Sequence, residues 1–122
     1  MEKKYDLEER TRKFGENIIS FCKKISKDEI TKPLITQLIK SGTSVGANYC
    51  EANCAESRRD FEHKIGICKK EAKETLFWLK MFEKTLPNNK ESVSLLLKEG
   101  TELYLIFVAI VKKSKENDTR RN

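Results

Sequence analysis

The segment from Phe61 to Leu86, FEHKIGICKKEAKETLFWLKMFEKTL, decides the fold of this chain. Apolar or small residues recur in it at alternating steps of four and three, with mostly polar residues between them. This spacing matches an α-helix and continues for about seven turns. It predicts one long amphipathic helix whose apolar stripe has to be buried: Phe61, Ile65, Cys68, Ala72, Thr75, Leu79, Phe82 and Leu86.

Three other segments keep similar spacing, which predicts a bundle of four helices, at about residues 6–26, 32–55, 58–86 and 90–114. Asp6 with Glu9, and Ser57 with Asp60, are N-capping pairs, and Pro33 suits a first helical turn. The expected inward-facing residues of the other three helices are Leu7, Thr11, Phe14, Ile18, Phe21 and Ile25; Leu34, Leu38, Val45, Ala52 and Ala55; and Val93, Leu96, Gly100, Leu103, Phe107, Ile110 and Ser114.

The composition supports an all-α fold in one domain. The 122 residues include only 5 Gly and 2 Pro, and 36% of them are charged, which suits long helices and does not suit a sandwich or barrel. This length is enough for one core and too short for two. We expect a single domain over residues 1–114 and a disordered basic tail over residues 115–122.

Two glycines interrupt the second helix. Each of Gly42 and Gly46 costs about 1 kcal/mol relative to alanine in a helix interior, so close packing against another helix, or a kink, is expected there. A phosphate-binding loop is the alternative, but no strand precedes the segment and no Gly-Lys-Ser/Thr follows it.

The charge balance favours polyanionic partners. The chain has 25 Lys and Arg against 19 Asp and Glu, a net charge of +6. RNA, DNA or an anionic membrane surface would be attracted by this excess. The alternative is an ordinary solvated surface that happens to be basic.

The cysteines and the apolar runs predict a cytoplasmic protein that does not cross a membrane. Cys22, Cys50, Cys54 and Cys68 fall on or beside apolar stripes, as buried thiols of a reducing compartment do. The N-terminus has no apolar signal core. The longest apolar run, from Leu103 to Val111, is shorter than the roughly 20 residues that a membrane span needs.

Two segments carry more apolar surface than one stripe requires: Leu76 to Phe82, and Leu103 to Val111. A helix that carries apolar residues all around its surface is normally buried on more than one side. We therefore expect a subunit interface in a homo-oligomer, although a thick core in a monomer is the alternative. The expected interface residues are Phe77, Trp78, Leu105, Phe107 and Val108.

Two sequence motifs resemble a known family. Ser44 to Ala52 reads SVGANYCEA, and Ser57 to Phe61 reads SRRDF. With them, the chain resembles the four-helix-bundle proteins encoded in intervening sequences of large-subunit ribosomal RNA genes, a family that includes the accessory variability protein of diversity-generating retroelements. The resemblance covers nearly the whole chain.

This resemblance implies an antiparallel up-down-up-down bundle with a left-handed twist, which assembles into a ring-like homopentamer without established catalytic activity. It also implies a basic surface. The retroelement relative binds nucleic acid and a reverse transcriptase, so nucleic acid and such a protein are the partners that the resemblance suggests.

Polar residues near the core are expected to have structural roles. Ser44, Asn48 and Glu51 lie three or four residues apart and share a helix face. Their hydrogen bonds would fix a neighbouring helix or the register of a subunit. The structural role of Ser57 and Asp60 is to cap the start of the third helix. A ligand site inside the bundle is the alternative.

We expect no metal and no cofactor. Di-iron bundles use Glu-x-x-His on two helices, whereas this chain has one histidine and only Asp60-x-x-His63 resembles the motif. Cys50 and Cys54 share a face, but zinc requires more ligands.

The expected nucleic-acid-binding residues lie in the third helix and at the end of the fourth. Several weak contacts to phosphates, repeated in an oligomer, would act together. No aromatic residue for stacking bases is evident on these surfaces, so sequence-specific reading of single strands is not expected. The residues are Arg58, Arg59, Lys64, Lys69, Lys70, Lys73, Lys112 and Lys113, and Lys115, Arg120 and Arg121 add to the basic tail.

The sequence thus favours a non-enzymatic oligomer that binds RNA or DNA through phosphates, possibly as an adaptor. One alternative is a protein-interaction scaffold without a nucleic-acid role. Another is a metal-independent ribonuclease similar to the HEPN family, in which His63 moves protons and Arg58 stabilises the charged phosphorane.

Overall fold

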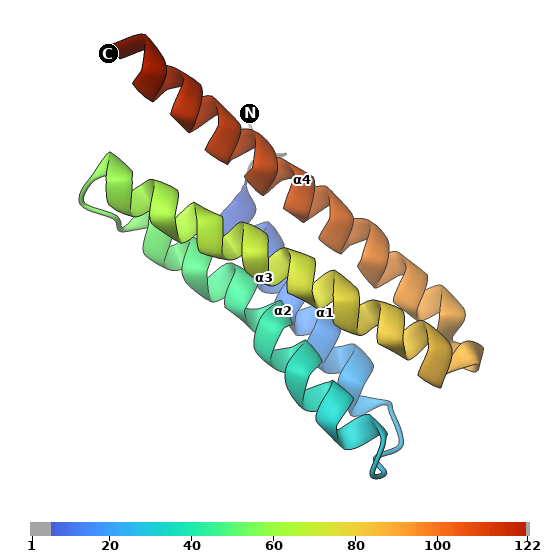
Figure 1. Ribbon diagram of the computed structural model, residues 1–122. Helices are drawn as coiled ribbons and strands as arrows, with labels where there is room; N and C mark the ends of the chain where they lie inside the picture. The colour runs from blue at the N-terminus through green and yellow to red at the C-terminus, as the bar shows by residue number, and fades with distance from the viewer. Residues whose placement is uncertain (1–5, 122) are drawn as a thin grey trace.

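The computed structural model describes residues 6–121, with side chains as far as residue 117, and this part of the chain consists of helices and short connections, without a strand. The elements are α1 (Leu7–Lys23), α2 (Thr31–Asn53), α3 (Arg58–Thr85), the short 3₁₀ helix η2 (Pro87–Asn89) and α4 (Lys90–Arg121). Figure 1 shows the four long helices side by side. The α1–α2 and α3–α4 connections lie at one end of the molecule, and the α2–α3 connection lies at the other.

Two of the predicted helix starts are confirmed by their caps. The Glu9 backbone N–H donates to the Asp6 carboxylate at 3.3 Å, and the Asp60 N–H donates to Ser57 Oγ at 3.0 Å. Each bond satisfies a backbone donor that a helix N-terminus otherwise leaves unpaired.

The start of α2 depends on a residue that the sequence analysis overlooked. Asp28 Oδ1 accepts from the N–H of Ile30 at 2.9 Å and from that of Thr31 at 2.8 Å. These backbone hydrogen bonds lower the pKa of the Asp28 carboxyl. The first helix also ends earlier than expected, at Lys23 instead of residue 26.

The predicted end of the fourth helix at residue 114 differs from the structure, in which α4 continues to Arg121. The expected disordered tail is therefore helical over residues 115–121, and residue 122 lies outside the described residues. No Gly or Pro occurs between Lys112 and Arg121, and Lys, Glu and Arg are good helix formers, so nothing in the sequence stops the helix.

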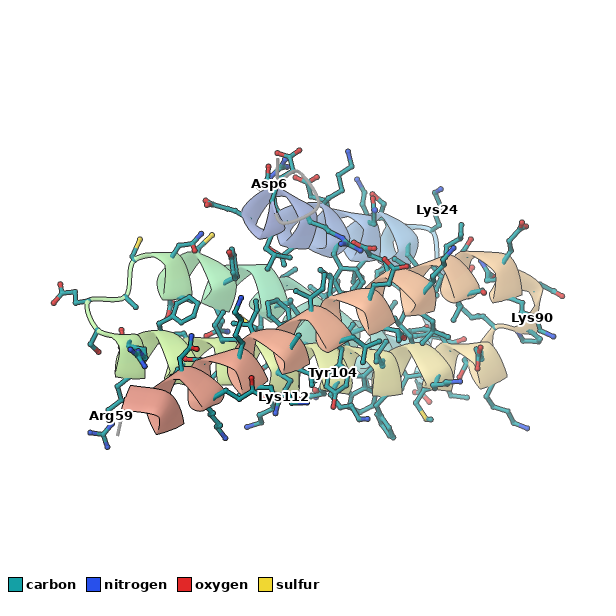
Figure 2. The ribbon with its side chains drawn as sticks, turned by 90° about the horizontal axis from the view of Figure 1, so that it is seen from above. Asp6, Lys24, Arg59, Lys90, Tyr104 and Lys112 are labelled. Carbon is teal, nitrogen blue, oxygen red and sulfur yellow. The ribbon has the colours of Figure 1, made fainter. Side chains whose placement is uncertain are left out.

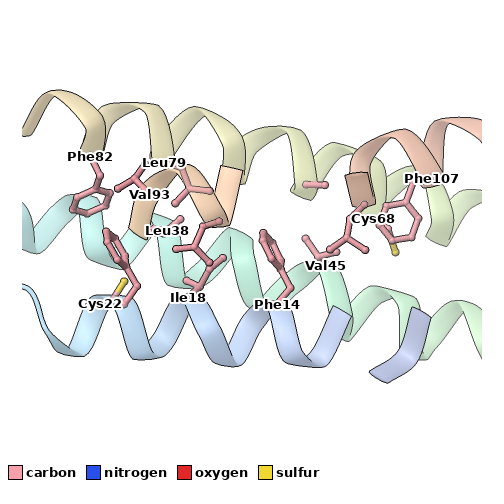
Figure 3. Packing of buried hydrophobic residues seen from close by; sticks show 14 of the residues in the cluster. Phe14, Ile18, Cys22, Leu38, Val45, Cys68, Leu79, Phe82, Val93 and Phe107 are labelled. Carbon is pink, nitrogen blue, oxygen red and sulfur yellow. The ribbon is translucent and has the colours of Figure 1, made fainter. Parts of the chain in front are cut away.

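The core contains most of the predicted inward-facing residues, several of which are seen in Figure 3. Phe21 of α1 meets Phe82 of α3 edge to face, with ring centroids 5.6 Å apart. At the centre of the α2–α3 contact, Thr75 Oγ1 lies 3.0 Å from Ser41 Oγ, and both side chains are buried. Ala55 and Ser114 are only half-buried, as are Leu34, Phe61, Leu86 and Ile110.

The glycines of α2 lie against α1, which confirms the expected close packing. A Cβ on Gly42 would lie 2.4 Å from Ile18 Cδ1, and one on Gly46 would lie 3.3 Å from the Thr11 backbone. Side chains at these two positions would push α1 away from α2, so their small size sets the distance between the helices.

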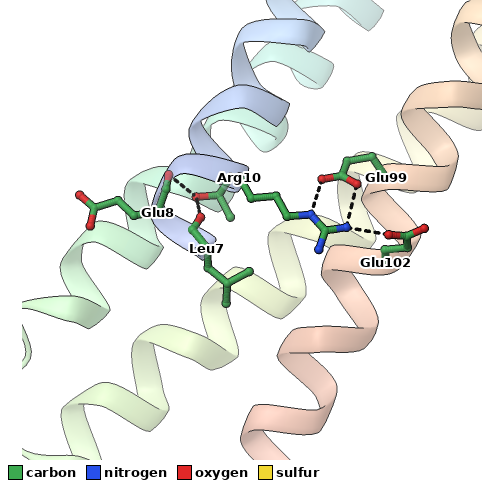
Figure 4. Close-up of polar contacts among 6 residues, drawn as sticks. Leu7, Glu8, Arg10, Glu99 and Glu102 are labelled. Carbon is green, nitrogen blue, oxygen red and sulfur yellow. Dashed lines mark hydrogen bonds and ion pairs between the residues drawn. The ribbon is translucent and has the colours of Figure 1, made fainter. Parts of the chain in front are cut away.

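An arginine joins α1 to α4 (Figure 4). Arg10 Nε donates to Glu99 Oε2 at 2.7 Å, and Arg10 Nη2 donates to Glu99 Oε1 at 2.9 Å and to Glu102 at 2.6 Å. The hydrogen bonds with Glu99 are the main cause that raises the pKa of Arg10 above its ordinary value. This fork links two helices that are far apart in sequence.

The predicted interface residue Phe107 lies in the core of the single chain, with none of its surface exposed, so it cannot contact another subunit. Tyr49 of α2 covers it, with ring centroids 6.3 Å apart. The sequence analysis treated the whole run from Leu103 to Val111 as surplus apolar surface. Most of this run packs against the chain's own core, whereas Leu105 is 57% exposed.

Within the described residues, no helix combines the length and the apolar character that a membrane span requires.

Candidate nucleic-acid interface

Lysine side chains gather around an open groove between α3 and α4. One part of the groove, of about 690 Å³, is lined by four lysines and one glutamate together with apolar and aromatic residues. The lysines come from α3, and Tyr104, labelled in Figure 2, comes from α4. The full lining is Lys69, Lys70, Lys73, Glu74, Leu76, Phe77, Lys80 and Tyr104.

A second hollow continues this groove towards the end of α4. It is lined by Lys69, Val108, Val111, Lys112, Lys115 and Glu116. Because Lys69 borders both hollows, they form one surface, which we call the α3–α4 groove. Near its end, the Ser114 hydroxyl donates to the Glu62 carboxylate and ties the two helices together.

The groove between α1 and α2 has the opposite charge. It is lined by four acidic residues and one basic residue, with small residues such as Gly15 and Ala47 between them. The acidic residues are Asp6, Glu8, Glu9 and Glu16. Figure 2 shows Asp6 and Lys112 at opposite edges of the molecule. The positive charge of the chain is therefore concentrated on the side of α3 and α4.

Five of the predicted nucleic-acid-binding residues belong to the α3–α4 side. Lys69, Lys70, Lys73 and Lys112 line the groove directly. Arg59 precedes Lys73 by fourteen residues, close to four helical turns, and therefore falls on the same side of α3.

The other three predicted residues lie elsewhere. Lys64 Nζ contacts Glu51 of α2 at 2.6 Å, and this hydrogen bond is the main cause that raises the pKa of Lys64. Lys113 is exposed, and its side chain projects from α4 in a direction about 100° around the helix axis from that of Lys112. Arg58 is half-buried at the first position of α3. The sequence grouped these residues by proximity in the chain, whereas the helix turns them to different sides.

The predicted polar cluster on α2 forms hydrogen bonds within its own helix and one bridge to α3. Ser44 Oγ donates to the Lys40 carbonyl at 2.7 Å, and Asn48 Nδ2 donates to the Ser44 carbonyl at 2.9 Å. Glu51 accepts from Lys64. These contacts satisfy the polar groups locally and tie α2 to α3.

The geometry does not pair the two residues of the ribonuclease alternative. Arg58 and His63 are five positions apart on α3, so their side chains leave the helix about 140° apart. His63 is exposed. Among the described residues, no group of three or more His, Cys, Asp or Glu side chains is placed to hold a metal ion.

The expectation of four buried thiols is wrong for two of them. Cys22 and Cys68 are buried, but Cys50 and Cys54 are exposed at the C-terminal end of α2. Cys50 Sγ lies 4.0 Å from the Glu8 carboxylate. Both exposed residues fall outside the buried face of α2, which Val45 and Ala52 define.

The sequence analysis missed the aromatic residues of the basic surface. Lys73 Nζ lies 5.0 Å from the centre of the Tyr104 ring, a cation–π contact between α3 and α4. Phe77 is 51% exposed. The spacing of Lys69, Lys73, Phe77 and Lys80, in steps of four, four and three, was the signal that could have placed Phe77 among lysines.

These features define a class: an all-α protein of four helices with a lysine-lined groove between the last two. The family model described as 23S rRNA-intervening sequence protein matches residues 3–108, so the chain belongs to that family. This confirms the resemblance seen in the sequence.

A similar fold occurs in a crystal structure from Bacteroides thetaiotaomicron, of a protein with unknown function from the S23 ribosomal protein family. The two chains are 31% identical, with a TM-score of 0.79, and the similarity covers 86% of this chain and 97% of the other. No curated protein matches the chain.

Proposed function

We propose that this protein is a non-enzymatic homo-oligomer that binds RNA or DNA through backbone phosphates and serves as an adaptor. The observation that carries the proposal is the separation of charge between the α3–α4 groove and the acidic α1–α2 groove. Phosphates would be attracted to one side of the molecule and repelled from the other.

Three lysines of the groove, Lys69, Lys70 and Lys112, are available for phosphates. Within the part of the chain whose side chains are described, no ion pair joins Lys69, Lys70 or Lys112 to a carboxylate, in contrast to Lys64 and Arg10. A lysine that is already paired would have to break its ion pair before binding a phosphate. Unpaired lysines instead release only counterions, which makes the binding strongly dependent on salt.

The arrangement of subunits is also part of the proposal. We take the four helices to form an antiparallel up-down-up-down bundle with a left-handed twist, which assembles into a ring of five. Contacts such as Thr11 with Gly46 and Ile18 with Gly42 support the antiparallel order of α1 and α2, because residue numbers rise along one helix as they fall along the other. Leu105, exposed on the outer side of α4, is the residue through which subunits would meet.

The remaining predicted interface residues lie in or near the groove. Phe77 lines the first hollow and Val108 the second. Trp78 is half-buried, and its Nε1 donates to Glu74 at 3.2 Å. We therefore assign Phe77 and Val108 to ligand binding and Leu105 to subunit contact. The four free cysteines support a reducing compartment such as the cytoplasm.

Affinity for an RNA of arbitrary sequence, measured at 50 and 200 mM salt, tests the nucleic-acid part. A double variant, Lys69→Gln with Lys112→Gln, should bind at least 10-fold more weakly and with a smaller salt slope. The matched control is Lys32→Gln with Lys40→Gln, which removes the same charge from exposed positions of α2. Equal loss in both double variants would contradict a defined site, and absence of binding would favour a scaffold that interacts with proteins alone.

Light scattering tests the oligomer, because one chain has a mass of 14.2 kDa. Leu105→Glu should reduce the measured mass of an assembly to that of one chain. A wild-type mass of 14.2 kDa would remove the ring. Incubation of RNA with the protein in EDTA tests the absence of ribonuclease activity: cleavage that disappears in His63→Ala would contradict it.

A further inference from the structure

The α3–α4 groove combines lysines with two aromatic rings, Phe77 and Tyr104. From this combination, and resting on the nucleic-acid function proposed above, we infer that the groove binds single-stranded nucleic acid by stacking bases on Phe77 and Tyr104 while its lysines contact the phosphates. The groove would therefore prefer single-stranded to double-stranded nucleic acid, whereas its lysines alone would bind any polyanion.

Phe77 has the position of a stacking platform. Its ring lies against Trp78, with centroids 4.9 Å apart and an interplanar angle of 81°. This contact holds the Phe77 side chain in place, while 51% of it remains exposed to solvent in the groove. A held and exposed ring loses little freedom when a base stacks on it.

Tyr104 is the second platform and is covered by a lysine. Lys73 Nζ lies 5.0 Å from its ring centroid. A base that stacks on Tyr104 would displace this ammonium, which then lies next to the phosphate of the same nucleotide. The base replaces the cation on the ring, and the cation gains a phosphate, so neither group is left without a partner.

The groove is long enough for several nucleotides. Lys69, Lys73, Phe77 and Lys80 occupy one side of α3 and extend over about 16 Å at 1.5 Å per residue. The second hollow continues the surface with Val108, Val111 and Lys112. Positive charges thus lie on both sides of the rings, as in other single-strand-binding grooves, where aromatic and basic residues alternate.

A double strand cannot use the rings in the same way. Its bases are stacked on each other inside the duplex, so only its phosphates can reach the lysines. An acidic amphipathic helix of another protein would also find an apolar floor and lysines here. The two aromatic rings among the lysines favour bases over such a helix, because aliphatic side chains would suffice to bind it.

The test uses Trp78, the single tryptophan of the chain, as a reporter beside Phe77. A 5′-phosphorylated oligouridine of twenty nucleotides and a blunt RNA duplex of ten base pairs with both 5′ ends phosphorylated, which carry the same number of phosphates, are titrated into the full-length protein at 100 mM salt. The single strand should change the Trp78 fluorescence and bind at least 5-fold more tightly than the duplex. Phe77→Leu should weaken oligouridine binding about 10-fold and leave duplex binding unchanged.

Leu95→Ala is the matched control, because it trims an apolar side chain that is 66% exposed and lies outside the groove. It should alter neither affinity. Lys73→Gln provides a second variant, which should weaken binding of both RNAs. Both groove variants change side chains on the surface of α3, and circular dichroism checks that they are folded.

The possible outcomes separate the inference from the proposed function. Equal binding of both RNAs, with no effect of Phe77→Leu, would overturn base stacking and leave phosphate binding intact, whereas binding of neither RNA would remove both. If instead a helical Leu/Glu peptide changes the Trp78 fluorescence and RNA does not, the groove is a protein-docking site and the inference is wrong. A changed oligomer mass in Phe77→Leu would identify the groove as a subunit interface and would also overturn the inference.

Discussion

Gly42 on α2 lies against Ile18 on α1 so closely that a Cβ on the glycine would come within 2.4 Å of Ile18 Cδ1 and 3.3 Å of its Cγ2. Ile18 is completely buried, which leaves Cδ1 little room to turn away, and the stiff χ1 angle of a β-branched residue holds Cγ2 in place. This contact fixes the separation of the first two helices.

Gly42→Ala should therefore destabilise the protein. The substitution gains about 1 kcal/mol of helix propensity but overpacks the α1–α2 contact at a cost of about 1–3 kcal/mol. We expect a net loss of about 1 kcal/mol in the free energy of unfolding, measured by urea denaturation. Gly66→Ala is the control, because a Cβ there meets nothing within 4 Å, and it should gain about 1 kcal/mol. Equal gains in both variants would contradict the close contact.

Arg10→Lys should weaken the junction of α1 and α4. Lysine cannot reproduce the forked contact with Glu99 and Glu102, and we expect a loss of about 1 kcal/mol in the free energy of unfolding. Arg12→Lys, on the exposed face of the same helix with Glu9 and Glu16 as neighbours, should leave the free energy of unfolding unchanged, because exposed ion pairs contribute little. If the two variants lose the same amount, the fork has no special role.

Alkylation of the thiols should divide the cysteines into two pairs. At pH 8 in the folded protein, Cys50 and Cys54 should react with iodoacetamide, while the buried Cys22 and Cys68 should remain protected. Mass spectrometry of peptides after brief labelling reads this out. In guanidinium all four should react, and labelling of Cys68 in the folded protein at the rate of Cys50 would contradict the burial.

The buried thiols should also make stability fall at alkaline pH. Burial raises the pKa of Cys68 to about 12 and that of Cys22 to about 11. In the unfolded chain these thiols ionise near pH 9, so above that pH the unfolded state binds fewer protons than the folded state, and stability falls as the pH rises.

The expected decline, above pH 9, is at most about 1.4 kcal/mol per pH unit for each thiol. Urea denaturation at pH 7, 8.5 and 10 measures it. Cys68→Ala should flatten the decline, although it lowers stability at neutral pH by leaving a gap in the core. A variant with an unchanged slope would show that other groups cause it.

The helices and the core could be predicted because spacing and caps act within a few residues. The positions from Phe61 to Phe82, and the Ser57–Asp60 pair, follow from local periodicity alone. The end of α4 could not be predicted in this way, because no stop signal occurs and a polar composition does not distinguish an exposed helix from a disordered tail. Asp28 was missed because the residue three positions after it, Thr31, is not an acidic residue like the Glu9 and Asp60 that marked the other two caps.

The candidate site was predicted only in outline. Charge placed Lys69 and Lys73 on a binding surface, but whether a residue faces the groove depends on how α3 turns against α4. That arrangement takes Lys64 towards Glu51 and brings Tyr104, from the other helix, to Lys73. Pairings between helices that are 31 residues apart in sequence, as for Tyr104 and Lys73, leave no local pattern in the sequence.

The opposite charges of the α1–α2 and α3–α4 grooves give each molecule an electric dipole moment across its long axis. In the field of any polyanion, this dipole produces a torque that turns α3 and α4 towards the negative charge before contact. The charges of the two grooves would thus set the orientation at first encounter. The torque falls off over a Debye length of about 8 Å at physiological salt.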